Sequence, residues 1–281
     1  TSSNKPIQMM FNGLLAFDKD LNIQPCLAES WENVDDCNVI FHLRKGVKFH
    51  NGYDFTAEDV KFSFERMMNS PRIAFVLPPI EKIEIVDDYT VKVITAQPFG
   101  AILSHLSHPT AAILNEKAVK EYGDSYGQHP VGTGPYKFIS WQSGDRIVLE
   151  ANPEYFLGEA PIKNVIFRPI TEGSNRTIAI ETGEIDIAYD IEGLDKDRLR
   201  NDDSVVFIEE PSLSIDYIGF NTRKEPFNNV KVRQAIATAI NADDIITAVY
   251  KGSGTKANSL IGPKVFGYSS EPKAWEYNVE K

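Results

Sequence analysis

The sequence predicts an α/β fold of the mixed α+β kind, in which short strands and helices build more than one lobe. Its 281 residues are 42% hydrophobic, which suffices for a core in each of two lobes. Residues 11–48 alternate short apolar runs with turn signals, as antiparallel strands do. Residues 165–188 read as strand, helix and strand, an order that indicates a mixed sheet.

Residues 17–127 are predicted to form an α+β subdomain. After the strands of residues 11–48, Thr56 is placed to cap a helix over 57–69, with Asp59 at the capping-box position. A hairpin and a short helical stretch follow, at residues 80–85, 90–94 and 101–106.

Residues 129–135 read His-Pro-Val-Gly-Thr-Gly-Pro and are predicted to mark a boundary, because this composition suits neither a helix interior nor a central strand. Gly132, Thr133 and Gly134 are expected to shape the turn between subdomains and the floor of a cleft. We expect them to act through backbone geometry rather than through direct contact with a ligand.

The second half of the chain alternates predicted strands with helices. Gly183 is expected to close the first helix and Gly252 the last, each in a left-handed conformation, while Asn241 separates the last two helices and caps the second of them. Strands are predicted at residues 136–141, 147–151, 165–169, 185–188 and 214–221. Helices are predicted at 174–181, around an apolar face from Val232 to Ile240, and around a second apolar face from Ile245 to Tyr250. Residues 253–281 are rich in Gly, Ser, Pro and Lys and contain no terminating strand.

Composition excludes two classes of protein. Lys and Arg total 29 against 40 Asp and Glu, and the resulting charge of −11 repels polyphosphate, so we expect no nucleic-acid binding. The longest apolar runs are far shorter than the ~18 residues that span a bilayer, so no transmembrane segment is predicted. The chain starts at Thr1 without Met or a signal-like segment, and we expect any export signal to have been removed.

Cys26 and Cys37 are predicted to be free thiols, although a disulfide stays open. Cys37 lies in a turn of the predicted strand pair and Cys26 lies well back from it, so the two are not cross-strand partners. No C-x-x-C motif accompanies them, which argues against a metal or redox role.

The catalytic patterns in the sequence are weak. Ser125 stands in a G-x-S-x-G match, but the preceding segment is charged and helical instead of a buried strand. His105 and His108 have a chelating spacing but no Cys or carboxylate at ligand spacing. Glu184 and Asp186 imitate a glycosidase pair only in sequence. We therefore expect no catalytic residue, no metal site and no cofactor, with a hydrolase kept as the alternative from another class.

Motifs spread over almost the whole chain resemble the signature of the family-5 extracellular solute-binding proteins. They comprise GLLAFD at residues 13–18, PCLAESWE at 25–32, FHLRKGVKFHNG at 41–52, FTAEDV at 55–60, PVGTGPY at 130–136, TGEID at 182–186 and FN-to-VKVRQA at 220–235. The resemblance implies a periplasmic-binding-protein-like fold of type II. It also implies that the family continues upstream of Thr1 and beyond Lys281, so that the first lobe is nearly complete and the second only begun.

The resemblance further implies an arrangement of domains. Residues 1–16 and 128–213 form the discontinuous core of lobe I with a mixed sheet, residues 17–127 form its α+β subdomain, and residues 214–281 begin lobe II. Ligand is expected between the lobes. Thr1, Ser2 and Ser3 fall at the end of a ligand-contacting loop.

The segment that leads into the second lobe supplies the other expected site residues. Ser214, Ile215 and Asp216 are expected at the hinge. Tyr217 is expected to present its ring and hydroxyl to the cleft, with an ordinary half-buried strand tyrosine as the equal alternative.

The function that the resemblance implies is capture of di- or oligopeptides for the permease subunits of an ABC importer. The protein is then a monomer and not an enzyme. It lies outside the cytoplasm, in a periplasm or as a cell-surface lipoprotein of a Gram-positive cell. A nickel-chelate or other small-solute binder of the same family is the first alternative, and a docking receptor is a further one.

Overall fold

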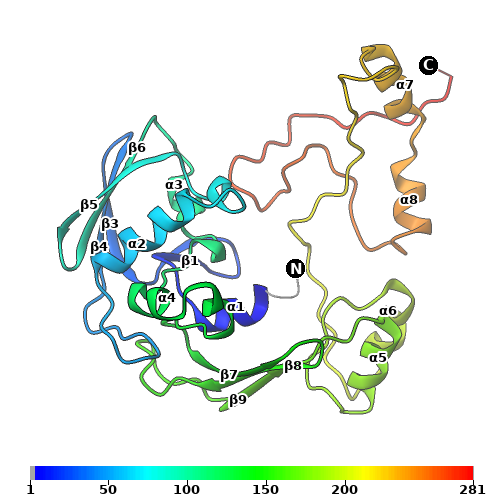
Figure 1. The fold of residues 1–281 in the computed structure, drawn as a ribbon. Helices are drawn as coiled ribbons and strands as arrows, with labels where there is room; N and C mark the ends of the chain where they lie inside the picture. The colour runs from blue at the N-terminus through cyan, green and yellow to red at the C-terminus, as the bar shows by residue number, and fades with distance from the viewer. Residues whose placement is uncertain (1–3, 281) are drawn as a thin grey trace. The chain divides into compact units, whose positions relative to one another are not determined.

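The computed structural model describes residues 4–280, which divide into two units at the bond between Pro169 and Ile170 (Figure 1). Both units contain helices, and the first contains three sheets, so the predicted mixed α/β class is confirmed. None of the helices among these residues has the length and apolar content that a bilayer crossing requires. The lobe boundaries at residues 128 and 214 stay predictions.

The first unit contains three antiparallel sheets, ordered β1-β2, β3-β4-β6-β5 and β7-β8-β9. The nine strands are β1 Leu15–Phe17, β2 Ile23–Pro25, β3 Ala28–Asp35, β4 Asn38–Leu43, β5 Ile80–Asp87, β6 Thr90–Thr95, β7 Tyr136–Gln142, β8 Arg146–Ala151 and β9 Asn164–Phe167. The α-helices are α1 Asn4–Met10, α2 Ala57–Met68, α3 Ile102–Leu106 and α4 Glu116–Tyr122, and the 3₁₀ helices are η1 Ala74–Val76, η2 Pro109–Ala111 and η3 Gly123–Gln128.

The main core lies between the four-stranded sheet and α2 (Figure 1). Strict alternation along β4 buries every second side chain, and the register sets Phe41 opposite Val91 of β6. Phe64 contributes from the apolar face of α2. Period-two strands and a helix with an apolar stripe bury their faces against each other, as the sequence pattern predicted.

The start of α2 is held by the buried carboxylate of Asp59. This side chain accepts a hydrogen bond from the Thr56 backbone N–H at 3.1 Å and another from the Glu116 N–H at 3.3 Å. Burial raises the pKa of the Asp59 carboxyl, and the two backbone N–H groups act in the opposite direction. The predicted capping box is confirmed, and it also joins α2 to the first residue of α4.

The smaller core of the first unit lies between α1 and the sheet β7-β8-β9 (Figure 1). Met10 at the end of α1 packs with Tyr136, Leu149 and Ala151. The sequence analysis predicted no helix at residues 4–10. Pro6 is compatible with this helix because it lies in the first turn, where its missing N–H has no intrahelical partner.

The second unit contains α5 Gly173–Glu181, α6 Gly193–Arg200, α7 Val230–Ala239 and α8 Ala242–Ala248. The predicted ends are confirmed: Gly183 and Gly252 have φ of 70° and 78°, and the Asn241 side chain accepts from the N–H groups of Asp243 and Asp244. Helix α6 was not predicted.

Two predicted strands in the second unit, at residues 185–188 and 214–221, are wrong. Among residues 170–280 no strand lies beside either segment, and a lone extended chain leaves its backbone groups and side chains uncovered. Ile187 accordingly is 67% exposed. The strand–helix–strand order expected over 165–188 is not observed, and all ladders of the described chain are antiparallel.

In place of a strand, the guanidinium of Arg176 organises residues 170–190. Its Nη1 donates to the carbonyl oxygens of Ile170 and Thr171, both at 2.9 Å. Its Nε and Nη2 donate to the carbonyls of Tyr189 and Asp190, at 3.1 and 2.7 Å. One side chain on α5 therefore ties together the two ends of this loop.

Both cysteines are free, as predicted. Cys26 is 5% exposed, and its burial raises the pKa of the thiol to about 11, whereas Cys37 is partly exposed. Burial limits both access to the Cys26 sulfur and its thiolate fraction.

We expect N-ethylmaleimide at pH 8 to modify Cys37 in the native protein and Cys26 only after unfolding in urea. Peptide mass spectrometry after timed quenching measures both rates. Equal labelling rates in the native state would contradict the burial of Cys26.

We also expect Asp59→Ala to lower the free energy of unfolding by about 1–2 kcal/mol, because two buried N–H groups lose their acceptor. Glu58→Ala is the matched control, since Glu58 is an exposed acid in the same helical turn. Urea titration followed by circular dichroism measures both, and equal losses would show that the capping box does not act as described.

Candidate functional site

Gly132 and Gly134 lie against the end of α1, so closely that neither position accepts a side chain. A Cβ at Gly132 would lie 2.0 Å from the carbonyl oxygen of Met10, and one at Gly134 would lie 2.4 Å from that of Met9. The Gly134 N–H donates to the Met10 oxygen at 2.9 Å. The need for glycine here comes from the close approach of two backbones.

The imidazole of His50 closes the other side of this turn. Its Nε2 lies 3.0 Å from the Gly134 carbonyl oxygen, and its Nδ1 accepts from the Gly132 N–H at 3.3 Å. The His50 backbone N–H donates to the Gly132 carbonyl at 2.8 Å. Because one ring nitrogen faces an acceptor and the other a donor, the neutral Nε2–H tautomer fits both.

His50 is kept neutral by its surroundings. Burial lowers the pKa of the imidazole to about 4, the hydrogen bond to Gly134 opposes this shift, and the positive charge of Lys137 adds to it. The sequence analysis noted His50 only within the FHNG motif and gave it no role. The only feature that could have indicated this role is the presence of the histidine, because its partners lie more than 80 residues away in the chain.

Buried side chains complete the hydrogen bonding of the turn. The Thr133 hydroxyl donates to Asn12 Oδ1 at 3.0 Å, and Asn152 Nδ2 donates to the Gly134 carbonyl at 3.2 Å. The Asn152 N–H donates to the Pro135 carbonyl at 2.8 Å. The N–H groups of both glycines are thus engaged within the protein, and the turn acts as a fixed support for α1.

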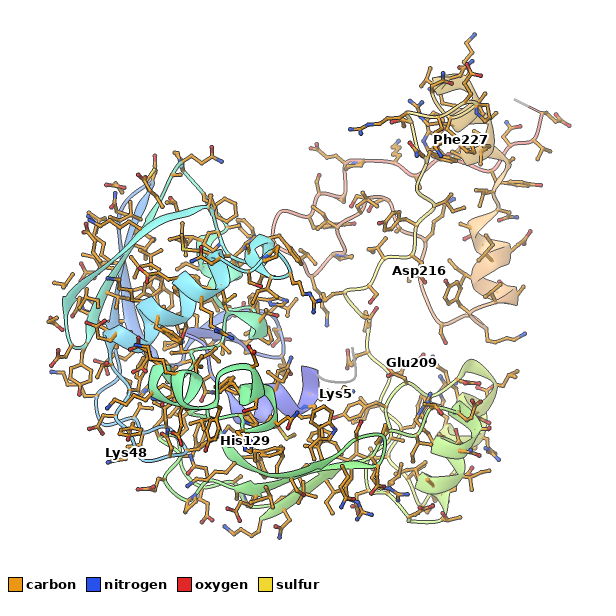
Figure 2. All side chains as sticks on the ribbon, viewed as in Figure 1. Lys5, Lys48, His129, Glu209, Asp216 and Phe227 are labelled. Carbon is orange, nitrogen blue, oxygen red and sulfur yellow. The ribbon has the colours of Figure 1, made fainter. Side chains whose placement is uncertain are left out.

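Ser214, Ile215, Asp216 and Tyr217 belong to the second unit and lie on irregular chain that leads to α7 (Figure 2). Asp216 Oδ2 accepts from the hydroxyl of Tyr250 on the turn after α8, at 2.6 Å. Tyr217 is 71% exposed, so it is not the half-buried strand tyrosine of the alternative interpretation. Thr1, Ser2 and Ser3 lie outside the described residues.

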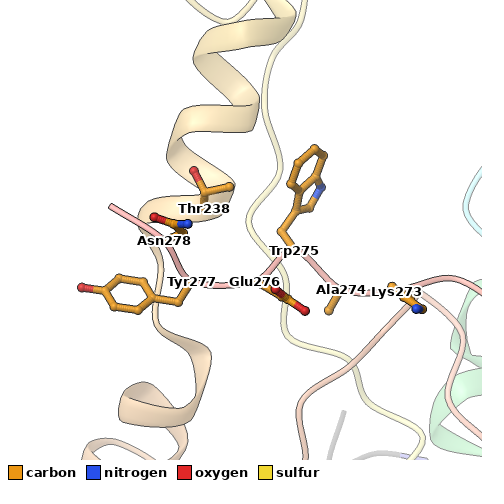
Figure 3. A pocket seen from close by; sticks show the side chains of 7 residues that line it. All are labelled: Thr238, Lys273, Ala274, Trp275, Glu276, Tyr277 and Asn278. Atoms are coloured by element: carbon orange, nitrogen blue, oxygen red, sulfur yellow. The ribbon is translucent and has the colours of Figure 1, made fainter. Parts of the chain in front are cut away.

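A shallow pocket in the second unit lies where the C-terminal segment passes α7 (Figure 3). The Asn278 N–H donates to the carbonyl of Thr238 at 2.7 Å and anchors this passage. The side chains of Trp275 and Tyr277 stay about half exposed. The sequence analysis did not single out these residues, and their spacing along the chain does not predict a pocket.

The residues of the weak catalytic patterns are engaged in local contacts. Ser125 lies in η3, and its hydroxyl donates to the Tyr122 carbonyl at 2.7 Å. His105 Nδ1 lies 2.7 Å from the Val76 carbonyl, and His108 Nδ1 accepts from the Thr110 N–H. Residues 4–280 hold no group of three or more His, Cys, Asp or Glu side chains placed to bind a metal.

Comparison with known families decides the identity of the chain. The sequence profile described as "Bacterial extracellular solute-binding proteins, family 5 Middle" matches residues 22–281. The chain belongs to this family. The family-5 resemblance predicted from the motifs is therefore confirmed.

Known relatives of this family-5 protein bind different solutes. The glutathione-binding protein GsiB of Pectobacterium atrosepticum is 34% identical over 276 residues, which are 96% of this chain and 54% of that protein. The chain thus spans about half the length of the curated relatives that it matches.

Solved structures of similar proteins confirm the type II periplasmic-binding-protein fold. DppA of Helicobacter pylori in complex with the peptide STSA has a TM-score of 0.81 at 30% identity, over 97% of this chain and 58% of that one. NikZ of Campylobacter jejuni in complex with Ni(L-His) has a TM-score of 0.83 at 27% identity, over 96% and 55%.

We expect Gly134→Ala in this family-5 protein to lower the free energy of unfolding by about 3 kcal/mol, because the new methyl group overlaps the backbone of Met9 and Met10. Gly127→Ala is the matched control, since a Cβ there meets open space. Urea unfolding of both variants measures the difference. A Gly134→Ala protein as stable as the control would contradict the close approach.

Proposed function

We propose that this chain is part of the substrate-binding component of an ABC importer, which captures di- or oligopeptides outside the cytoplasmic membrane and delivers them to the permease subunits. The observation that carries the proposal is family membership over residues 22–281, together with the likeness to peptide-bound DppA over 97% of the chain. The protein then works as a monomeric, non-catalytic carrier in a periplasm or on a cell surface.

Peptide capture in this proposal takes place between lobe I, residues 1–213, and lobe II, which begins at residue 214. Gly132, Thr133 and Gly134 shape the cleft floor, and Ser214, Ile215 and Asp216 form part of the hinge. An extended peptide offers its backbone hydrogen-bonding groups whatever its sequence, so main-chain contacts give affinity without strict side-chain selection.

Tyr217 is proposed to contact the ligand, together with Thr1, Ser2 and Ser3. Its ring is exposed, while its neighbour Asp216 is tethered by the Tyr250 hydroxyl. This tether restrains the backbone beside Tyr217 and leaves the aromatic ring accessible. A tyrosine with few side-chain torsions gives contact area at low entropic cost.

A nickel chelate is the second candidate ligand, because the chain is as similar in fold to NikZ with Ni(L-His) as to peptide-bound DppA. Small-solute capture uses the same two-lobed closure. The two candidates differ in the solute, not in the transport role.

Isothermal titration calorimetry on the full-length protein tests the proposal with di- to pentapeptides, reduced glutathione and Ni(L-His). We expect at least one peptide to bind with micromolar or tighter affinity, and Tyr217→Ala to weaken that affinity about tenfold through loss of the aromatic contact. Tyr53→Ala is the control, since this exposed tyrosine lies in the first unit and has no proposed ligand role. Binding of Ni(L-His), or of the γ-linked tripeptide glutathione, without binding of any α-linked peptide would overturn the assignment to di- or oligopeptides.

A further inference from the structure

We propose that His50 is a pH-sensitive lock: its neutral ring fastens the loop after β4 to the glycine turn and thereby to the end of α1, and its protonation opens this connection. The bonds from the ring to Gly132 and Gly134 carry the proposal, because they join segments more than 80 residues apart. The link from this lock to ligand capture rests on the proposed function.

Protonation changes the ring in one specific way. The neutral ring uses Nδ1 as an acceptor for the Gly132 N–H. A proton added to Nδ1 turns that nitrogen into a donor, so two N–H groups then face each other. The Gly132 N–H loses its partner, while the Nε2 bond to Gly134 is kept. The repulsion at Nδ1 is relieved when the Gly132 side of the turn moves away from the ring.

The surroundings of the ring offer little compensation for a positive charge. The turn that bonds the ring, residues 130–135, and the end of α1 on the other side of that turn, residues 6–10, contain no charged side chain. In the loop after β4, residues 44–56, the charged side chains are Arg44, Lys45, Lys48 and Asp54, of which Lys48 and Asp54 pair with each other at 3.6 Å. Lys137 on β7 acts on the imidazole and repels a proton.

The direction of the pH effect follows from the lowered pKa of the half-buried imidazole, about 4 against an ordinary value near 6.5. A depressed pKa means that the folded state prefers the neutral ring. The lock contributes its full stability above pH 6.5 and loses it as the pH falls towards 4. Between pH 6.5 and 4 the closed-to-open ratio falls roughly 80-fold, because the ring that is exposed by opening takes up a proton more readily than the ring in the closed lock.

The loosened element would be α1, because the turn reaches it directly. The Gly134 N–H bond to Met10 and the contacts of both glycines with Met9 and Met10 are the connection. The proposed ligand residues Thr1, Ser2 and Ser3 stand immediately before this helix in the sequence. On the proposed function, acid would then weaken capture by loosening α1.

Hydrogen–deuterium exchange on the intact protein tests the lock without any ligand. After correction for intrinsic exchange rates, we expect the protection of residues 130–136 to fall at least tenfold between pH 7.5 and 4.5. His50→Gln removes the titrating ring while keeping a donor and an acceptor, and its protection should not change with pH in this way. His42→Gln is the control, since His42 is a partly exposed ring on β4 paired with Glu32.

Protection that does not depend on pH in the unmodified protein, or the same dependence in His50→Gln, would overturn the lock. If His50→Gln does not fold, NMR titration of the His50 ring in the unmodified protein decides the question, because a midpoint near 6.5 instead of below 5 refutes it. Peptide calorimetry on the full-length protein at pH 7.5 and at a pH below the measured midpoint of His50 is a separate measurement. If hydrogen exchange shows that the lock opens in acid while the peptide affinity stays constant, the lock stands and only its link to ligand capture is refuted.

Discussion

The contact between two backbones, that of Gly132 and Gly134 with that of Met9 and Met10, is the constraint on which the first unit depends. It brings the end of α1 to the start of β7, so that Met10 reaches Tyr136 and Leu149 in the smaller core. The same turn also contacts the loop after β4, through the hydrogen bonds of the His50 ring. Side chains larger than hydrogen at the two glycines would separate these segments, because the atoms opposite them are backbone and cannot rotate away.

Elements with local signals could be predicted from the sequence. The capping box of α2, the alternation in β4 and the asparagine cap of α8 each depend on residues within four positions of one another. The strands expected at 185–188 and 214–221 depended on a neighbour that local sequence does not specify. Helix α1 was missed because seven residues are too few to show a helical period and because its packing partner, the sheet that begins at Tyr136, is far away in the sequence.

In the candidate site, too, local features could be predicted from the sequence and long-range contacts could not. The composition of the glycine turn predicted its position, and the predicted backbone role is compatible with the structure. The role of His50 was not predicted, because a single histidine in a motif does not indicate which distant residues it contacts. Buried polar groups in the turn are paired within the protein, with Asn12 and Asn152 taking part. Such a turn holds the end of α1 and the start of β7 in a fixed relation.

Arg176 gives the second unit a particular chemical sensitivity. Four main-chain carbonyl groups converge on its guanidinium and order residues 170–190 without a strand. A free guanidinium ion carries the same planar donor pattern and the same charge, so it competes for these oxygens as a direct mimic of the side chain. Urea is planar as well but uncharged. Both denaturants can donate N–H groups to these carbonyl oxygens, but only guanidinium also carries the charge of the side chain that ties residues 170–171 to residues 189–190.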